Sequence, residues 1–154
     1  MIHDYIFDVD GTLTPSRGII DPSFKTEFLN FAFKHRVFLV TGSDRQKTIE
    51  QLGRDVYHAC MRVYNCSGNS RWIRDRELYY SDWELPIDPR QWLQFKLDHS
   101  PFELRTGTHF ENRIGMCNFS IVGRGANQEQ RKQYYEYDCK HKERETIAKQ
   151  FNEK

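Results

Sequence analysis

Residues 7–14 read Phe-Asp-Val-Asp-Gly-Thr-Leu-Thr and follow the apolar pair Tyr5-Ile6 near the start of the chain. The bulky side chains of residues 4–9 favour a β-strand. Gly11 permits a sharp turn, so Asp8 and Asp10 come at the carboxyl end of this strand. In parallel α/β sheets, ligands bind outside the carboxyl ends of the strands. Residues 7–14 therefore predict a ligand-binding site at the carboxyl end of a β-strand.

The two aspartates suit phosphoryl transfer. A carboxylate such as Asp8 can attack phosphorus when Mg²⁺ neutralises the charge on both reactants. Asp10 lies two residues later, where it can give or take the proton of the leaving oxygen. Asp8 and Asp10 also form a partial magnesium site, since Mg²⁺ prefers a few carboxylates with water and phosphate oxygens. The hydroxyl of Thr12 is a candidate phosphate ligand.

The residues that follow alternate between helical and strand patterns. Asp21-Pro22 predicts the start of a helix whose apolar stripe extends to residue 35. Residues 37–40, Val-Phe-Leu-Val, predict a buried parallel strand. Ser43 and Gln46 predict the capping box of a second helix, for which Gly53 can serve as a stop or a bend, and a third strand is expected at 61–65. This order predicts the opening of a doubly wound α/β fold.

A second candidate phosphate site follows the strand at 37–40. The sequence there is Thr41-Gly42-Ser43-Asp44, and a hydroxyl from Thr41 or Ser43 can bind a phosphate oxygen. Taken alone, Thr41 is better explained as a strand end, and Ser43 as a helix cap, than as phosphate ligands. Their position after a matching first motif favours the phosphate-binding interpretation.

The character of the chain changes after residue 70. A hairpin is expected over 72–80, a linker over 82–88, and a helix after Asp88-Pro89. A strand pair is expected at 108–113 and 115–122, followed by polar helical sequence from residue 127. We therefore divide the chain into an α/β core portion, residues 1–81, and an α+β domain, residues 82–154.

Composition excludes several function classes. With 38% hydrophobic and 14% aromatic residues, the chain is expected to be globular. Its net charge of +1 gives no general attraction to nucleic acid or to an anionic membrane, so neither is an expected partner. The four cysteines lack zinc-site spacing and are expected to be reduced thiols. Because no signal-peptide or membrane-spanning pattern is visible, we expect a cytoplasmic protein.

Residues 7–14 resemble motif one of the haloacid-dehalogenase (HAD) superfamily of phosphohydrolases and phosphotransferases. More narrowly, the chain is similar to the eukaryotic-type phosphomannomutases. Residues 41–44 are similar to that family's Gly-Gly-Ser-Asp, and residues 65–69 lie where it has Glu-Asn-Gly. Residues 107–124 follow the family's cap sequence, and residues 128–138 continue in the same register. The resemblance covers nearly all of the chain.

This resemblance implies a HAD-like (Rossmann-type) partial core with an α+β cap. It implies a phosphotransferase that interconverts mannose 6-phosphate and mannose 1-phosphate through phospho-Asp8, with Mg²⁺ and a hexose 1,6-bisphosphate activator. Arg17 and Arg113 match substrate-binding arginines of the family. Arg105, which needs one residue of slippage, and Arg124 are further candidates. A homodimer through the cap, or a second chain that completes the fold, is the implied partner.

The family pattern includes segments that are not found in these 154 residues. By resemblance, a Gly-Asp strand end and a Gly-Gly-Asn-Asp segment complete the magnesium site, and the cap is expected to be incomplete. Two alternatives to a mutase stay open. One is a HAD-type sugar-phosphate phosphatase, in which water intercepts phospho-Asp8. The other is a catalytically poor remnant that binds sugar phosphates or a protein. The sequence also leaves mannose and glucose phosphates undistinguished.

Overall fold

We describe residues 3–153 from a computed structural model of the chain. These residues divide into two compact units. The first contains the described residues up to Trp83 together with Arg113–Met116, and the second contains Glu84–Asn112 and the residues from Cys117 onward. A division at residue 81 alone assigns Arg113–Met116 to the second domain, whereas the structure groups this tip of a hairpin with the first unit.

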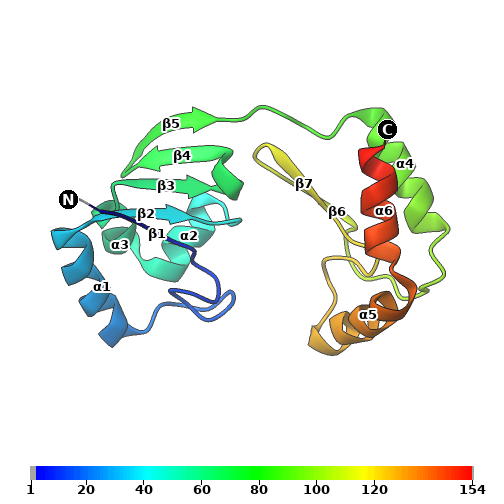
Figure 1. Ribbon diagram of the computed structural model, residues 1–154, viewed down its shortest axis with the longest axis horizontal. Coiled ribbons are helices and arrows are strands. Elements are labelled where there is room, and N and C mark those ends of the chain that lie inside the picture. Colours follow the sequence, from blue (N-terminus) through cyan, green and yellow to red (C-terminus); the bar gives the residue numbers. More distant parts are fainter. Residues whose placement is uncertain (1–2, 154) are drawn as a thin grey trace. The chain divides into compact units, whose positions relative to one another are not determined.

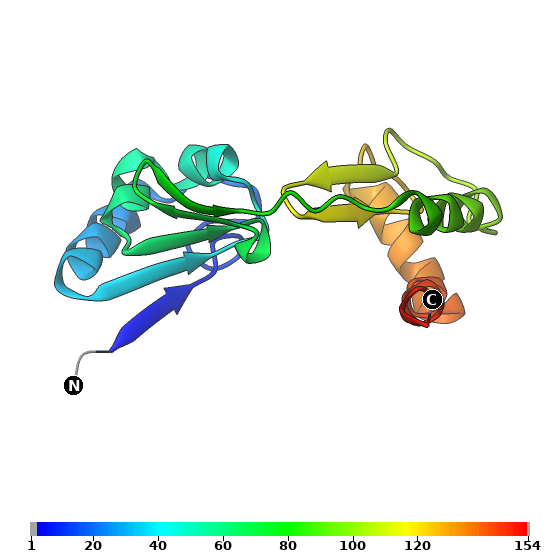
Figure 2. The ribbon, with the colours of Figure 1, turned by 90° about the horizontal axis from the view of Figure 1, so that it is seen from above.

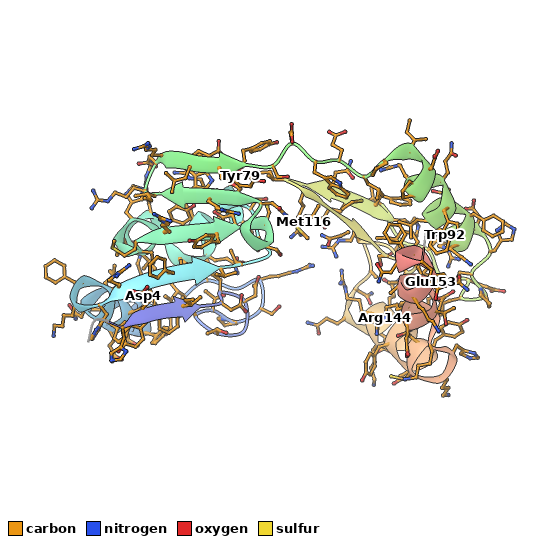
Figure 3. All side chains as sticks on the ribbon, turned by 45° about the horizontal axis from the view of Figure 1, so that its top comes forward. Asp4, Tyr79, Trp92, Met116, Arg144 and Glu153 are labelled. Carbon is orange, nitrogen blue, oxygen red and sulfur yellow. The ribbon has the colours of Figure 1, made fainter. Side chains whose placement is uncertain are left out.

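A five-stranded sheet in the order β1-β2-β3-β4-β5 forms the centre of the first unit (Figure 1). Its strands are β1 (Asp4–Phe7), β2 (Arg36–Val40), β3 (Arg62–Asn65), β4 (Ser70–Ile73) and β5 (Arg76–Tyr80). Strands β1 to β3 are parallel, and β4 and β5 extend the sheet as an antiparallel hairpin. Asp4 and Tyr79 mark the two edge strands (Figure 3). The predicted α/β class is confirmed.

Three helices pack on one face of this sheet (Figure 2). They are α1 (Pro22–Lys34), α2 (Arg45–Leu52) and α3 (Arg54–Ala59), and a short 3₁₀ helix, η1 (Cys66–Gly68), follows β3. Asp21 caps α1 as predicted, because its carboxylate accepts from the backbone N–H groups of Ser23 and Phe24. Helix and strand side chains share one buried core: Val9, Leu13, Ile20, Phe28, Ala32, Val37, Leu39, Leu52, Val56, Tyr57, Cys60 and Val63.

The start of α2 differs from the prediction. Asp44, not Ser43, is the N-cap, because its carboxylate accepts from the backbone N–H of Lys47 at 2.8 Å. A charged oxygen forms the stronger cap bond with the helix N-terminus. The predicted capping box of Ser43 and Gln46 is therefore wrong, and the Ser43 hydroxyl does not cap the helix. Gly53 ends α2 with φ +86°, as predicted.

The second unit contains α4 (Ile87–Asp98), α5 (Gln128–His141), α6 (Glu143–Asn152) and most of the strands β6 (Phe110–Arg113) and β7 (Met116–Phe119), whose tip residues Arg113 and Met116 belong to the first unit. Strands β6 and β7 form the predicted pair but are shorter than expected. Helix α4 begins at Ile87 after Pro86, so Asp88 lies in its first turn and is not its cap. The core is a small cluster: Leu97, Ile121, Val122, Ala126 and Tyr134. In residues 3–153 the helices are all too short or too polar to span a bilayer.

Candidate functional site

The turn after β1 is organised by the carbonyl of Val9. This oxygen accepts from the backbone N–H groups of Thr12, Leu13 and Thr14 at 3.0–3.3 Å. Gly11 closes the turn with φ +79° and donates its N–H to the Thr14 carbonyl at 2.8 Å. Val9 itself is fully buried. The residues on either side of it, Asp8 and Asp10, are thereby fixed at the carboxyl end of β1, as the sequence predicts.

Asp8 and Asp10 have different surroundings. Asp8 is exposed, and within residues 3–153 no hydrogen bond or ion pair engages its carboxylate. Asp10 is half-buried, and its Oδ1 accepts from the Arg17 backbone N–H at 2.6 Å and from Gln51 Nε2 at 2.9 Å. Ser43 Oγ lies 3.5 Å from its Oδ2. Asp8 is therefore an accessible carboxylate, whereas Asp10 is held in one orientation.

These contacts determine the charge of Asp10. The Arg17 backbone N–H is the largest influence, and it holds the pKa of Asp10 below its usual value. Partial burial opposes this effect. The side chains of Gln51 and Ser43 and the positive charge of Arg17 lower the pKa further. The lowered pKa favours the ionised form of Asp10, which is the form that can accept a proton.

The loop after β2 brings one predicted phosphate ligand to the paired aspartates. Ser43 Oγ approaches Asp10, as described above. Thr41 is only 3% exposed, and its hydroxyl accepts from the Ser43 backbone N–H at 3.1 Å. Thr41 therefore shapes the loop from within. Thr12, by contrast, is exposed on the turn after β1. The roles of all three in phosphate binding stay predictions.

Two of the predicted substrate arginines belong to the first unit. Arg17 is exposed and has φ +61°, which points its backbone N–H at Asp10. A guanidinium nitrogen of Arg113 donates to the Gly42 carbonyl at 2.8 Å. Gly42 stands between Thr41 and Ser43, so Arg113 lies at the loop that follows β2.

The other two predicted arginines lie in the second unit and are engaged there. The guanidinium of Arg105 donates to the backbone carbonyls of Leu97, Ser100, Phe102 and Leu104. Arg124 Nη2 forms an ion pair with Glu111 Oε2 at 2.8 Å. In this structure both side chains therefore brace their own unit. Their binding of substrate stays a prediction.

Sequence reasoning missed two buried polar residues beside the site. Gln51, 1% exposed, contacts Asp10, and Asn65, fully buried, donates to the carbonyl of Ser43 at 3.3 Å. Asn65 also donates to Thr48 Oγ1 and accepts from the Tyr57 hydroxyl, both at 2.8 Å. The available signal was a polar pair, Thr48 and Gln51, on the inward side of α2. Polar residues within a helical pattern are usually assigned to the solvent-exposed face.

The donor set at the aspartates fits part of a magnesium site. Asp8 offers carboxylate oxygens that have no hydrogen-bond or ion-pair partner within residues 3–153, and Asp10 places a second carboxylate two residues later. Among residues 3–153, no group of three or more His, Cys, Asp or Glu side chains is arranged to hold a metal. One or two carboxylates with water and phosphate oxygens are the usual protein contribution to bound Mg²⁺. Asp8 and Asp10 are therefore suitable ligands for Mg²⁺ and supply only part of its coordination shell.

Parallel strands with helices, and an aspartate pair after β1, make this chain an α/β protein with a candidate site at the carboxyl end of its first strand. A profile of the family described as eukaryotic phosphomannomutase matches residues 25–154. The chain belongs to the eukaryotic phosphomannomutase family, so the resemblance found in the sequence is confirmed.

Individual relatives agree with this membership. The chain is 30% identical to Phosphomannomutase 1 of Dictyostelium discoideum and 33% identical to the Phosphomannomutase of Nicotiana benthamiana. Each alignment covers 97% of this chain and 62% of the relative, so the chain spans about three-fifths of these proteins. Among solved structures, the IMP-bound IMP-nucleotidase mutant of Plasmodium falciparum shares the fold. It has a TM-score of 0.50 and 14% identity, covering 92% of this chain and 46% of that one.

Proposed function

We propose that this chain is part of a Mg²⁺-dependent aspartyl phosphotransferase that interconverts mannose 6-phosphate and mannose 1-phosphate. The observation that carries the proposal is the pair of carboxylates after β1. Asp8 is exposed and has no hydrogen-bond or ion-pair partner within residues 3–153, whereas Asp10 beside it accepts two hydrogen bonds through Oδ1. An accessible carboxylate suits a nucleophile, and an oriented one suits proton transfer. Family membership favours a sugar phosphate as the substrate.

In the proposed reaction, the enzyme begins with a phosphate group on Asp8. A hydroxyl of the sugar monophosphate gives its proton to ionised Asp10, and its oxygen bonds to the phosphorus while the bond to Asp8 breaks. The product is a hexose bisphosphate. After the sugar turns, Asp8 attacks its other phosphate, and Asp10 returns the proton to the leaving sugar oxygen. Atoms and charge balance over the cycle, because Asp10 and Asp8 end as they began.

Asp8 and Asp10 would hold the Mg²⁺ ion. When bound there, the ion supplies positive charge that offsets the repulsion between carboxylate and phosphate. Thr12, Thr41 and Ser43 would bind the transferring phosphate. Arg17, Arg113, Arg105 and Arg124 would bind the sugar phosphate, because a guanidinium pairs with two phosphate oxygens at once.

Two further properties belong to the proposal. We place the enzyme in the cytoplasm, in mannose metabolism that leads to GDP-mannose, and the free thiols Cys60, Cys66, Cys117 and Cys139 agree with a reducing compartment. A homodimer through the second unit, or a second chain that completes the fold, stays a prediction. Size-exclusion chromatography with light scattering tests the first, and co-purification tests the second.

The test of the function is a phosphorus NMR assay on purified protein with Mg²⁺ and a hexose 1,6-bisphosphate. The proposal predicts interconversion of mannose 1-phosphate and mannose 6-phosphate, lost in Asp8→Asn and on chelation of the metal. Release of inorganic phosphate without isomerisation would instead identify a sugar-phosphate phosphatase. Absence of turnover, with equal sugar-phosphate binding by Asp8→Asn and native protein, would identify a binding remnant. Glucose phosphates assayed in parallel measure the sugar preference.

A further inference from the structure

Gln51 is a buried polar side chain in the last turn of α2, and it is 1% exposed. Its Nε2 lies 2.9 Å from Asp10 Oδ1, 3.3 Å from Thr14 Oγ1 and 3.3 Å from the Gly18 carbonyl. Its backbone carbonyl accepts from the N–H of Ile20 at 2.9 Å. A single residue of α2 thus contacts the loop after β1 at four points, and the shortest side-chain contact is to Asp10.

The orientation of this amide follows from its neighbours. The three atoms around Nε2 are oxygens of a carboxylate, a hydroxyl and a carbonyl, of which two can only accept hydrogen bonds. With the amide reversed, Oε1 would face the Asp10 carboxylate and the Gly18 carbonyl, which is repulsive. In the observed orientation, Oε1 is buried and has no partner within residues 3–153. Burying a half-satisfied amide destabilises a core. A leucine would fill this position without that cost.

We propose that Gln51 is a positioning residue for Asp10, whose amide N–H holds the Asp10 carboxylate in the orientation that exchanges a proton with the substrate. The inference rests on the proposed function and deepens it. Gln51 acts here with the Arg17 backbone N–H, since both donate to the same oxygen. Oδ2 is left toward Ser43 as the oxygen that can take the proton.

Two variants of Gln51 separate positioning from packing. Gln51→Met keeps the size of the side chain but removes the donor. Gln51→Glu keeps the shape but places a second carboxyl group against Asp10. Thr14→Val is the matched control, because it removes another partner of the same amide, together with the Thr14 hydrogen bond to the Val9 carbonyl, while keeping both Gln51 and Asp10. Thermal unfolding of all three variants measures how much stability each substitution removes.

The first readout needs no turnover. Carbon-detected NMR of the full chain at pH 7 reports the surroundings of the Asp10 carboxylate through the resonance of its carboxyl carbon. The inference predicts that this resonance moves in Gln51→Met and in Gln51→Glu and stays at the native position in Thr14→Val, because the first two variants remove the amide donor at 2.9 Å. It would be overturned if the Asp10 resonance stayed in place in Gln51→Met.

The second readout is steady-state kinetics of the active protein. Loss of a positioning contact is expected to lower kcat by about tenfold or more, with KM changed by less than about twofold. A kcat equal to that of Thr14→Val, at equal melting temperature, would contradict the inference. If the native chain shows no turnover, the proposed function fails, and the carboxyl resonance of Asp10 still decides whether Gln51 holds that side chain.

Discussion

A guanidinium nitrogen of Arg113 donates to the carbonyl oxygen of Gly42, 71 residues earlier in the chain, at a distance of 2.8 Å. Gly42 lies between Thr41 and Ser43, the two predicted phosphate ligands of the loop after β2. Arg113 stands at the end of β6 and is grouped with the first unit. An arginine assigned to substrate binding from sequence resemblance is therefore held at the loop that approaches Asp10.

Arg113→Lys tests whether this arginine binds phosphate. Lysine keeps the charge but loses the planar fork that pairs with two oxygens. We expect KM for the sugar phosphate to rise by about tenfold, with a smaller effect on kcat. Arg62→Lys, at an exposed position on β3, is the matched control and should leave both constants unchanged. Equal KM values for the two variants would remove Arg113 from the substrate site.

Arg17 combines a strained backbone with a predicted binding role. At φ +61°, a residue with a Cβ atom is less stable than glycine by about 1 kcal/mol. We therefore expect Arg17→Gly to unfold with a free energy about 1 kcal/mol higher than Arg17→Ala in urea denaturation. Both variants lose the guanidinium, and both should bind sugar phosphate equally weakly. If Arg17→Ala binds as well as native protein, Arg17 has no role in substrate binding.

Tyr57 and Asn65 form a buried pair behind the loop after β2. The Tyr57 hydroxyl donates to Asn65 Oδ1 at 2.8 Å, and both side chains are fully buried. Tyr57→Phe leaves that amide oxygen without a donor, which should cost about 1–3 kcal/mol of unfolding free energy. Tyr64→Phe is the control, since the Tyr64 hydroxyl makes no hydrogen bond in the part of the chain described. A loss no larger than that of the control would show that water replaces the tyrosine.

The lowered pKa of Asp10 predicts how the stability of the fold changes at acid pH. Because the folded state lowers this pKa below the ordinary 3.8, ionised Asp10 stabilises the fold at pH values above 3.8. That contribution is lost as the pH falls through the folded pKa. The stability difference between native protein and Asp10→Asn should therefore be constant above about pH 5 and shrink below pH 3.8. Urea denaturation from pH 3 to pH 7 measures it, and a difference that grows on acidification would contradict the geometry of Asp10.

The parts of the fold that sequence predicts well are those set by local chemistry. The turn at Gly11 and the cap at Asp21 depend on residues within a few positions of one another, and both are found as expected. Asp44 caps α2 instead of Ser43, because its carboxylate accepts from the Lys47 N–H and the helix begins one residue later than the Ser43–Gln46 pattern predicts. Patterns of type and spacing cannot rank two such adjacent candidates, whereas the hydrogen bonds of the folded chain do.

The site itself depends on long-range contacts, which is why sequence gave only part of it. Gln51 meets Asp10 across 41 residues, and its one local signal, a polar pair with Thr48 on the inward side of α2, does not identify Asp10 as its partner. Arg105 shows the opposite case. Its family-like position indicates a substrate ligand, but its guanidinium donates to four nearby carbonyls. Sequence motifs identify candidate phosphate ligands. The hydrogen bonds of the folded chain show which of these side chains already have partners.

The account depends most on Asp8 as the acceptor of phosphate. Borohydride reduces an aspartyl phosphate to homoserine, which tandem mass spectrometry locates in the chain. Protein incubated with Mg²⁺ and a hexose 1,6-bisphosphate, then reduced, is predicted to carry homoserine at position 8, and Asp8→Asn is predicted to carry none. Turnover of sugar phosphate by protein that stays unlabelled at position 8, or labelling at another carboxylate, would contradict the account.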